Sequence, residues 1–164
     1  RMDVISAAIR FGAEITDLAE LELCYAPPFG SAKDPVNMLG FTAENIITGK
    51  VKQFFWDDVE KLPRDGSVTL LDVRTKTEAA CGMIDGFVNI PLDSLRNNIS
   101  EIPEGKPVYI HCYSGLRSYI ACRILNGFGY ECYNLAGGWR LYESVVNEKT
   151  VPDYPCTICD ARSE

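Results

Sequence analysis

Residues 107–118 read PVYIHCYSGLRS, and they place one cysteine between a strand and a helix. The apolar run 107–110 is typical of a buried strand, and residues 116–128 have the apolar spacing of a helix. Cys112 therefore lies in the turn before a helix, where backbone N–H groups and the helix dipole favour negative charge. We expect this turn to stabilise a thiolate and to hold an anion.

Strands and helices alternate on both sides of this turn, across residues 50–147. Because parallel strands need crossover connections, the pattern predicts a three-layer α/β domain with a mostly parallel five-stranded sheet and helices on both faces. Functional sites in such sheets lie at the carboxyl ends of strands, where Cys112 is expected. The expected strands are 51–55, 68–73, 86–90, 107–111 and 132–135, and the expected helices are 57–62, 75–81, 92–98, 116–128 and 138–146. The helix at 116–128 is expected to bury a stripe made of Ile120, Ala121, Ile124, Leu125 and Phe128.

The segments outside this domain have a different character. Residues 1–49 contain an amphipathic helix near the amino end, a helical stretch at 17–23, and a helix that begins at Asp34-Pro35 with aspartate as N-cap. Two or three helices cannot form a core alone, so this segment is expected to be the remnant of another domain. Residues 148–164 are expected to be a linker or tail, and their Cys156-x-x-Cys159 lacks the second ligand pair that a zinc site needs.

Composition excludes several classes of function. The net charge is −7 and the sequence has no basic cluster, which argues against nucleic acid or an anionic membrane as a partner. No apolar run is long enough for a membrane span, and no stretch has the order of a signal peptide. The seven cysteines are an odd number in a chain with enough apolar residues for a core, so we expect reduced thiols and a cytoplasmic location.

The turn after the fourth strand supplies the candidate site. If a tight loop runs from Cys112 to Arg117, the N–H groups of residues 113–117 converge on the sulfur, and Arg117 adds a permanent positive charge. This predicts a partly exposed nucleophilic cysteine, and the alternative is a buried cysteine beside a helix cap with a solvated arginine. The candidate catalytic residue is Cys112, and the candidate substrate or anion-binding loop consists of Tyr113, Ser114, Gly115, Leu116, Arg117 and Ser118.

His111 is the single histidine of the chain, next to the candidate nucleophile. Consecutive strand residues point to opposite faces of a sheet, so the imidazole is not expected to reach the sulfur of Cys112. We expect a packed histidine that orients the loop, rather than a general base.

At these residues the segment 50–147 resembles a rhodanese domain. The resemblance is carried by residues 71–74 (LDVR), Glu78, residues 82–92, the loop 112–118 and residues 135–139, and it departs from the family at Met83, where histidine is common. It implies that Cys112 takes a sulfane sulfur, becomes a persulfide and passes the sulfur on. It also implies that the amides of 113–117 cradle the outer sulfur and that Arg117 helps to bind an anionic donor. Asp72 and Arg74 are expected to form a supporting network.

Residues 23–38 (LCYAPPFGSAKDPVNM) resemble the end of the dimerisation domain in FAD-dependent pyridine-nucleotide disulfide oxidoreductases. The type that they resemble most is the coenzyme A-disulfide or persulfide reductase, some of which continue into a rhodanese domain. This implies a piece of such a fusion, with FAD and NAD(P)H in the missing reductase domains and neither cofactor nor metal in this chain. The implied partners are thiosulfate, polysulfide or a small persulfide as donor and a thiol such as coenzyme A as acceptor. Self-association through residues 1–49 would give a homodimer.

Two other functions remain open from the residues. Rhodanese-like phosphatases and arsenate reductases use a similar loop, but the phosphatases carry five residues between cysteine and arginine, and this chain carries four. A shorter loop has a smaller mouth, which favours one sulfur atom over a tetrahedral phosphate. The second alternative is a non-catalytic rhodanese-like interaction module, against which the intact Cys112 and Arg117 argue.

Overall fold

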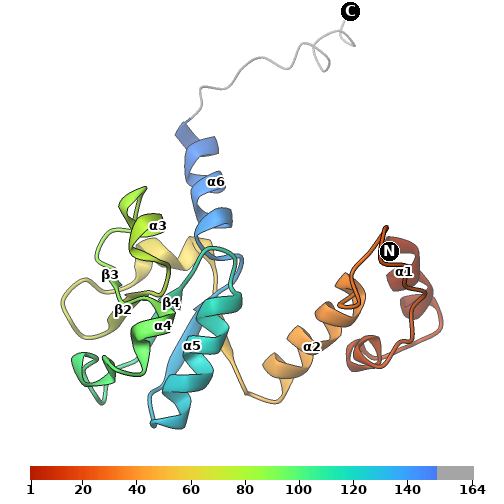
Figure 1. Cartoon of the computed structure of the whole chain (residues 1–164), viewed down its shortest axis with the longest axis horizontal. Helices are drawn as coiled ribbons and strands as arrows, with labels where there is room; N and C mark the ends of the chain where they lie inside the picture. The colour runs from red at the N-terminus through yellow and green to blue at the C-terminus, as the bar shows by residue number, and fades with distance from the viewer. Residues whose placement is uncertain (151–164) are drawn as a thin grey trace, which may run out of the picture. The chain divides into compact units, whose positions relative to one another are not determined.

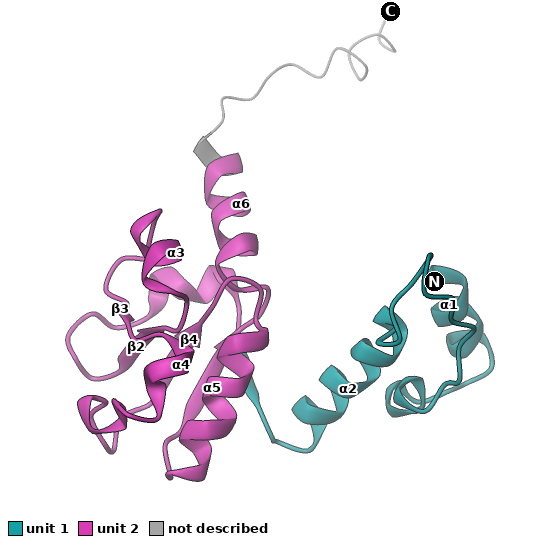
Figure 2. Ribbon diagram, in the orientation of Figure 1, with its two compact units in different colours: residues 1–53 teal, residues 54–164 magenta. Residues whose placement is uncertain are grey.

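The computed structural model describes residues 1–150 of the chain (Figure 1). The chain consists of two compact units, one formed by Arg1–Gln53 and the other beginning at Phe54 (Figure 2). The predicted segment 148–164 lies mostly outside the described residues, as do Cys156 and Cys159, so the division predicted at residue 148 stays a prediction.

The first unit consists of helix α1 (Met2–Arg10), the 3-10 helix η1 (Ile15–Ala19) and helix α2 (Pro35–Ile47). The predicted start of α2 is confirmed, because the Asp34 carboxylate accepts the N–H of Val36 at 2.9 Å and Pro35 is the first helical residue. Leu18 and Val36 are buried, whereas α1 has no buried residue.

The predicted helix at 17–23 is wrong in part. Its residues 17–19 belong to the 3-10 helix η1, and the chain is irregular from Glu20 to Asp34. The side-chain amide of Asn37 donates hydrogen bonds to the carbonyl oxygens of Leu18 at 3.0 Å and Leu21 at 2.8 Å. These carbonyls would otherwise serve a continuing helix, so the side chain of α2 satisfies them in its place.

The structure contains one five-stranded sheet, with strand order β1-β5-β4-β2-β3; strands β2 to β5 lie in the second unit, and β1 ends at its first residue, Phe54. Strands β2 and β3, β2 and β4, and β4 and β5 pair in parallel, which confirms the predicted α/β class. The strands are β1 (Lys52–Phe54), β2 (Thr69–Asp72), β3 (Val88–Asn89), β4 (Val108–His111) and β5 (Cys132–Leu135). The helices are η2 (Trp56–Lys61), α3 (Lys76–Ala80), α4 (Leu92–Leu95), η3 (Ile99–Glu101), α5 (Leu116–Gly127) and α6 (Gly138–Thr150).

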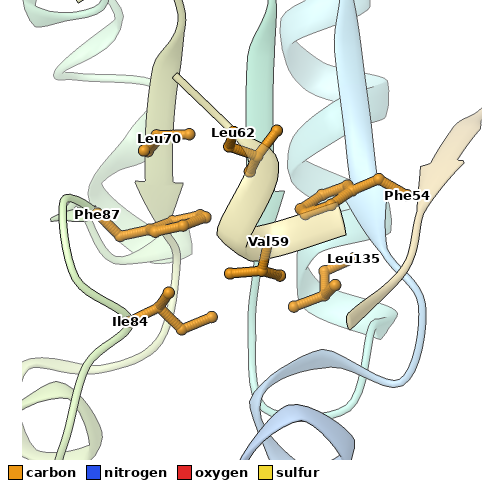
Figure 3. Packing of buried hydrophobic residues seen from close by; sticks show 7 residues of the cluster. All are labelled: Phe54, Val59, Leu62, Leu70, Ile84, Phe87 and Leu135. Atoms are coloured by element: carbon orange, nitrogen blue, oxygen red, sulfur yellow. The ribbon is translucent and has the colours of Figure 1, made fainter. Parts of the chain in front are cut away.

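An apolar cluster fills one face of this sheet. Figure 3 shows Val59 of η2 and Leu62, the residue after η2, between Leu70, Ile84 and Phe87 on one side and Phe54 and Leu135 on the other. Trp139 and Tyr142 of α6 pack against the same cluster. The buried members of the cluster are Phe54, Val59, Leu62, Leu70, Ile84, Phe87 and Leu135.

Helix α5 covers the opposite face, where it packs on β4 and β5. Its buried residues are Ser118, Ala121, Cys122 and Leu125. The predicted stripe is therefore wrong in part, because Ile120 and Phe128 are exposed. The small side chains on the buried face allow the helix to approach the sheet closely, and Ser118 at its first turn contacts the loop that contains Cys112.

Helix α6 runs to Thr150, four residues beyond its predicted end. Among the described residues, none of the helices has both the length and the apolar character that a membrane span requires.

Candidate active site

Cys112 is the first residue after β4, a central strand between β2 and β5. Its side chain is 1% exposed, so the predicted partial exposure is wrong. The turn that follows and the first turn of α5 close around the sulfur. The sulfur is therefore enclosed by this loop and does not lie on an open surface.

Two donors hold the sulfur of Cys112. The N–H of Gly115 lies 3.1 Å from the sulfur, and the hydroxyl oxygen of Ser118 lies 3.3 Å from it. Gly115 has a φ of +104°, a backbone conformation that L side chains rarely adopt, so glycine is needed to turn its N–H toward the sulfur. The amide of Asn134 on β5 donates to the Gly115 carbonyl at 3.2 Å and anchors the turn.

The start of α6 supports the loop from behind, a contact that the sequence reasoning missed. The N–H of Trp139 donates to the Cys112 carbonyl at 2.8 Å, and the N–H of Arg140 donates to the Tyr113 carbonyl at 2.9 Å. A Cβ on Gly138 would lie 2.7 Å from the Cys112 carbonyl oxygen. The consecutive glycines before Trp139 were the available signal, since two such residues indicate a close approach of backbones.

Arg117 forms a bidentate ion pair with Glu78 of α3, with both N–O distances at 2.7 Å. This pairing lowers the pKa of Glu78 to about 2, and Thr75 reinforces the shift through hydrogen bonds to the carboxylate. The same pairing raises the pKa of Arg117, and the nearby side chain of Cys112 contributes in the same direction. No role of Glu78 in the site was predicted, although the capping-box pattern Thr75-x-x-Glu78 marks the start of its helix.

Asp72 and Arg74 form a second ion pair, which is 0% and 1% exposed. The guanidinium donates to the Asp72 carboxylate at 2.7–3.1 Å and to the Gly82 carbonyl at 2.7 Å, and it lies 4.5 Å from the ring centre of Trp139. Apart from each other, they contact backbone carbonyls, the ring of Trp139 and the ring of His111, whose Nε2 lies 3.7 Å from the Asp72 carboxylate. The pair therefore fixes the segment that carries Glu78.

His111 lies on the other side of the backbone from the sulfur, as strand alternation predicts. Its ring packs edge-on to Phe87 at 4.8 Å, and its Nδ1 lies 3.3 Å from the carbonyl oxygen of Cys112. Burial lowers the pKa of His111 to about 4, although the neighbouring Asp72 carboxylate opposes the shift. The imidazole is thus neutral at neutral pH and orients the backbone of Cys112.

The remaining loop side chains lie at the surface. Tyr113, Ser114 and Leu116 are exposed, and none of them carries a charge at neutral pH. Within residues 1–150, the acidic, histidine and cysteine side chains form no cluster of three or more that could hold a metal ion.

Comparison with known proteins identifies the family of this chain. A model described as the rhodanese-like domain matches residues 55–144. A sulfurtransferase of Allochromatium vinosum is 41% identical over 80 residues, which make up 48% of this chain and 75% of that protein.

Two solved structures are similar over most of the chain. The reduced CoADR-RHD protein of Bacillus anthracis is 46% identical, with a TM-score of 0.85 over 90% of this chain and 26% of that one. The NAD-dependent persulfide reductase of A. fulgidus is 35% identical, with a TM-score of 0.71 over 84% of this chain and 24% of that one. The chain thus spans about a quarter of each of these longer proteins.

Proposed function

Since this chain belongs to the rhodanese-like domain family, we propose that it is a sulfurtransferase that carries sulfane sulfur as a Cys112 persulfide. One observation supports this proposal above others: a cysteine sulfur at a helix start accepts hydrogen bonds from the Gly115 N–H and the Ser118 hydroxyl. Both donors stabilise the thiolate, which is the nucleophilic form of cysteine.

In the first step the Cys112 thiolate attacks the outer sulfur of a donor. A bond forms between this sulfur and Sγ, and the bond to the rest of the donor breaks, so that the electron pair leaves with sulfite when the donor is thiosulfate. The new terminal sulfur carries the negative charge. The N–H groups of residues 113–117 and the Arg117 guanidinium are the groups proposed to stabilise it.

In the second step an acceptor thiolate attacks the terminal sulfur. The sulfur–sulfur bond to Cys112 breaks, the acceptor leaves as a persulfide, and the cysteine returns as a thiolate. His111 takes no proton in either step, because its ring contacts the Cys112 carbonyl and not the sulfur. Its proposed role is to hold the backbone of Cys112 in place, together with Trp139.

The similarity to a persulfide reductase supports a longer parent protein with reductase domains. We propose that such domains bind FAD and NAD(P)H, and that the rhodanese part exchanges sulfur with a small persulfide or a thiol such as coenzyme A. Residues 1–49 would belong to the dimerisation domain of this parent, and its location would be cytoplasmic.

Intact-mass measurement after incubation with thiosulfate or polysulfide tests the sulfur-carrier role. We expect an adduct of about 32 Da, one sulfur atom, that dithiothreitol removes and that is absent from Cys112→Ser. A wild-type protein that gains no sulfur from any sulfane donor would overturn the proposal.

Two alternative functions are distinguished by other assays. A phosphatase would turn over a generic aryl phosphate, which the four-residue spacing between Cys112 and Arg117 does not favour. A non-catalytic interaction module would have a Cys112 that alkylates no faster than a free cysteine at neutral pH.

A further inference from the structure

The charge of the Cys112 loop comes from a single side chain. Among residues 113–118, Arg117 is the only basic side chain and no side chain is acidic, and the exposed residues Tyr113, Ser114 and Leu116 are uncharged. The backbone N–H groups stabilise negative charge in any donor, so the side-chain contribution to a preference between anionic donors comes from this guanidinium.

Glu78 neutralises that guanidinium. Two oxygens of its carboxylate accept two N–H groups of Arg117 at 2.7 Å, and the side chains are about equally exposed, at 32% for Arg117 and 34% for Glu78. The guanidinium and the carboxylate form two parallel hydrogen bonds, which makes the pair stronger and more specific in geometry than a single contact between two charges.

The carboxylate is also fixed from its other side. The N–H of Thr75 donates to Oε2 at 2.9 Å and the hydroxyl of Thr75 donates to the same oxygen at 2.8 Å. Glu78 is thus built into the start of α3 and is not a mobile surface side chain that a substrate anion could easily displace.

Arg74 does not supply a positive charge in place of the Arg117 charge that Glu78 cancels. Arg74 is 1% exposed, and its guanidinium is bound to Asp72 and to the Gly82 carbonyl. The guanidinium groups of Arg74 and Arg117 are thus both paired with carboxylates.

We propose that Glu78 is a specificity-determining residue, which selects sulfur donors by charge. By cancelling the charge of Arg117, it disfavours the thiosulfate dianion relative to donors with one negative charge, such as thiosulfonates and organic persulfides. This inference rests on the proposed sulfurtransferase function and narrows its donor class.

Thiosulfate and methanethiosulfonate are a matched pair of probes. Methanethiosulfonate has a methyl group in place of one oxygen of thiosulfate and carries one negative charge instead of two. Both donate the same sulfane sulfur to the Cys112 thiolate: the Sγ–S bond forms, the S–S bond of the donor breaks, and sulfite or methanesulfinate leaves with the electron pair.

The experiment measures the second-order rate constant of Cys112 persulfide formation for each donor in a single turnover. Glu78→Gln keeps the shape of the side chain and removes its charge. We expect the ratio of the thiosulfate rate to the methanethiosulfonate rate to rise roughly five- to tenfold, and the rise to shrink in high salt. Glu104→Gln is the control, because Glu104 is exposed in the turn before the amino end of β4, whereas Cys112 follows the carboxyl end of this strand.

A second variant tests the inference independently, in case Glu78→Gln does not fold. Leu116→Lys adds a positive charge at an exposed loop position and leaves the Glu78–Arg117 pair in place, and its ratio is expected to rise in the same direction. A ratio that changes no more in a folded Glu78→Gln than in Glu104→Gln overturns the inference, as does an unchanged ratio in Leu116→Lys if Glu78→Gln does not fold. Failure of the wild type to form a persulfide with either donor would instead overturn the proposed function.

Discussion

The hydroxyl oxygen of Ser118 lies 3.3 Å from the sulfur of Cys112 and 3.2 Å from the carbonyl oxygen of Gly115. A hydroxyl has one hydrogen to donate, so it serves one of these two acceptors at a time. Because a thiolate accepts a stronger hydrogen bond than a neutral thiol, ionisation of Cys112 favours rotation of the hydroxyl toward the sulfur. Ser118 is thus placed to donate to the sulfur when the proposed thiolate forms and to the Gly115 carbonyl when it does not.

We expect Ser118→Ala to slow alkylation of Cys112 by iodoacetamide at neutral pH about tenfold, the effect of losing a hydrogen bond to a charged group worth about 1.5 kcal/mol. Peptide mass spectrometry separates Cys112 from the exposed Cys24 and Cys81. Ser114→Ala is the control, since Ser114 is exposed. Equal rates in Ser118→Ala and the wild type would mean that the hydroxyl does not stabilise the thiolate.

Gly138 is the point where α6 touches the loop, and we expect it not to tolerate a side chain. A Cβ there would lie 2.7 Å from the Cys112 carbonyl oxygen and 2.8 Å from the carbonyl carbon of Tyr113. Gly138→Ala should lower the free energy of unfolding by about 3 kcal/mol and reduce persulfide formation, because the backbone at the nucleophile must shift.

Gly129→Ala is a control that separates the effect of the steric clash at residue 138 from the effect of backbone strain. Gly129 has a φ of +88° and nothing within 4 Å of its Cβ position, so this variant should lose only about 1–2 kcal/mol and keep its activity. Urea unfolding of both variants makes the comparison, and equal losses would show that the contact with the loop does not matter.

Local patterns were sufficient to predict much of this fold. The predicted strand at 132–135 coincides with β5, and the helix start at Asp34-Pro35 is correct, because capping and β-propensity act within a few residues. The position of His111 away from the sulfur also followed from strand alternation alone.

Features that depend on distant contacts could not be predicted in this way. The rotation of α5 follows from its packing on the sheet, so its buried face differs from the most apolar stripe of its sequence. The burial of Cys112 and its support by Trp139 require the loop and α6 to meet. The pairing of Arg117 with Glu78 joins residues 39 positions apart, and no local rule specifies it.

The buried pair of Asp72 and Arg74 should be costly to break from either side. Asp72→Asn leaves a guanidinium in the core without its counter-charge, and we expect a loss of about 3–5 kcal/mol in the free energy of unfolding. The double variant Asp72→Asn/Arg74→Met removes both charges and should be more stable than Asp72→Asn alone. Urea unfolding of the single and double variants measures this coupling, and additive losses would indicate that the pair does not act as a unit.

Buried His111 makes a pH-dependent contribution to stability. Its folded-state pKa is about 4, below the ordinary value of 6.5, so the unfolded chain binds a proton in a range where the folded chain does not. Stability must therefore fall as the pH falls from about 6.5 to about 4, and we expect a loss of about 2 kcal/mol between about pH 7 and about pH 5. His111→Asn, which keeps a donor near the Cys112 carbonyl, should remove most of this loss in urea unfolding at the two pH values.

Glu78 titrates at lower pH than His111, so the contributions of the two residues to the pH dependence of stability can be separated. Its folded-state pKa of about 2 lies below the ordinary 4.5, so its contribution is complete above about pH 4.5 and disappears as the pH falls toward 2. Glu78→Gln should therefore leave the change between about pH 7 and about pH 5 as it is in the wild type. If His111→Asn keeps the wild-type slope in that interval while Glu78→Gln loses it, the assignment of the titration to the buried imidazole is wrong.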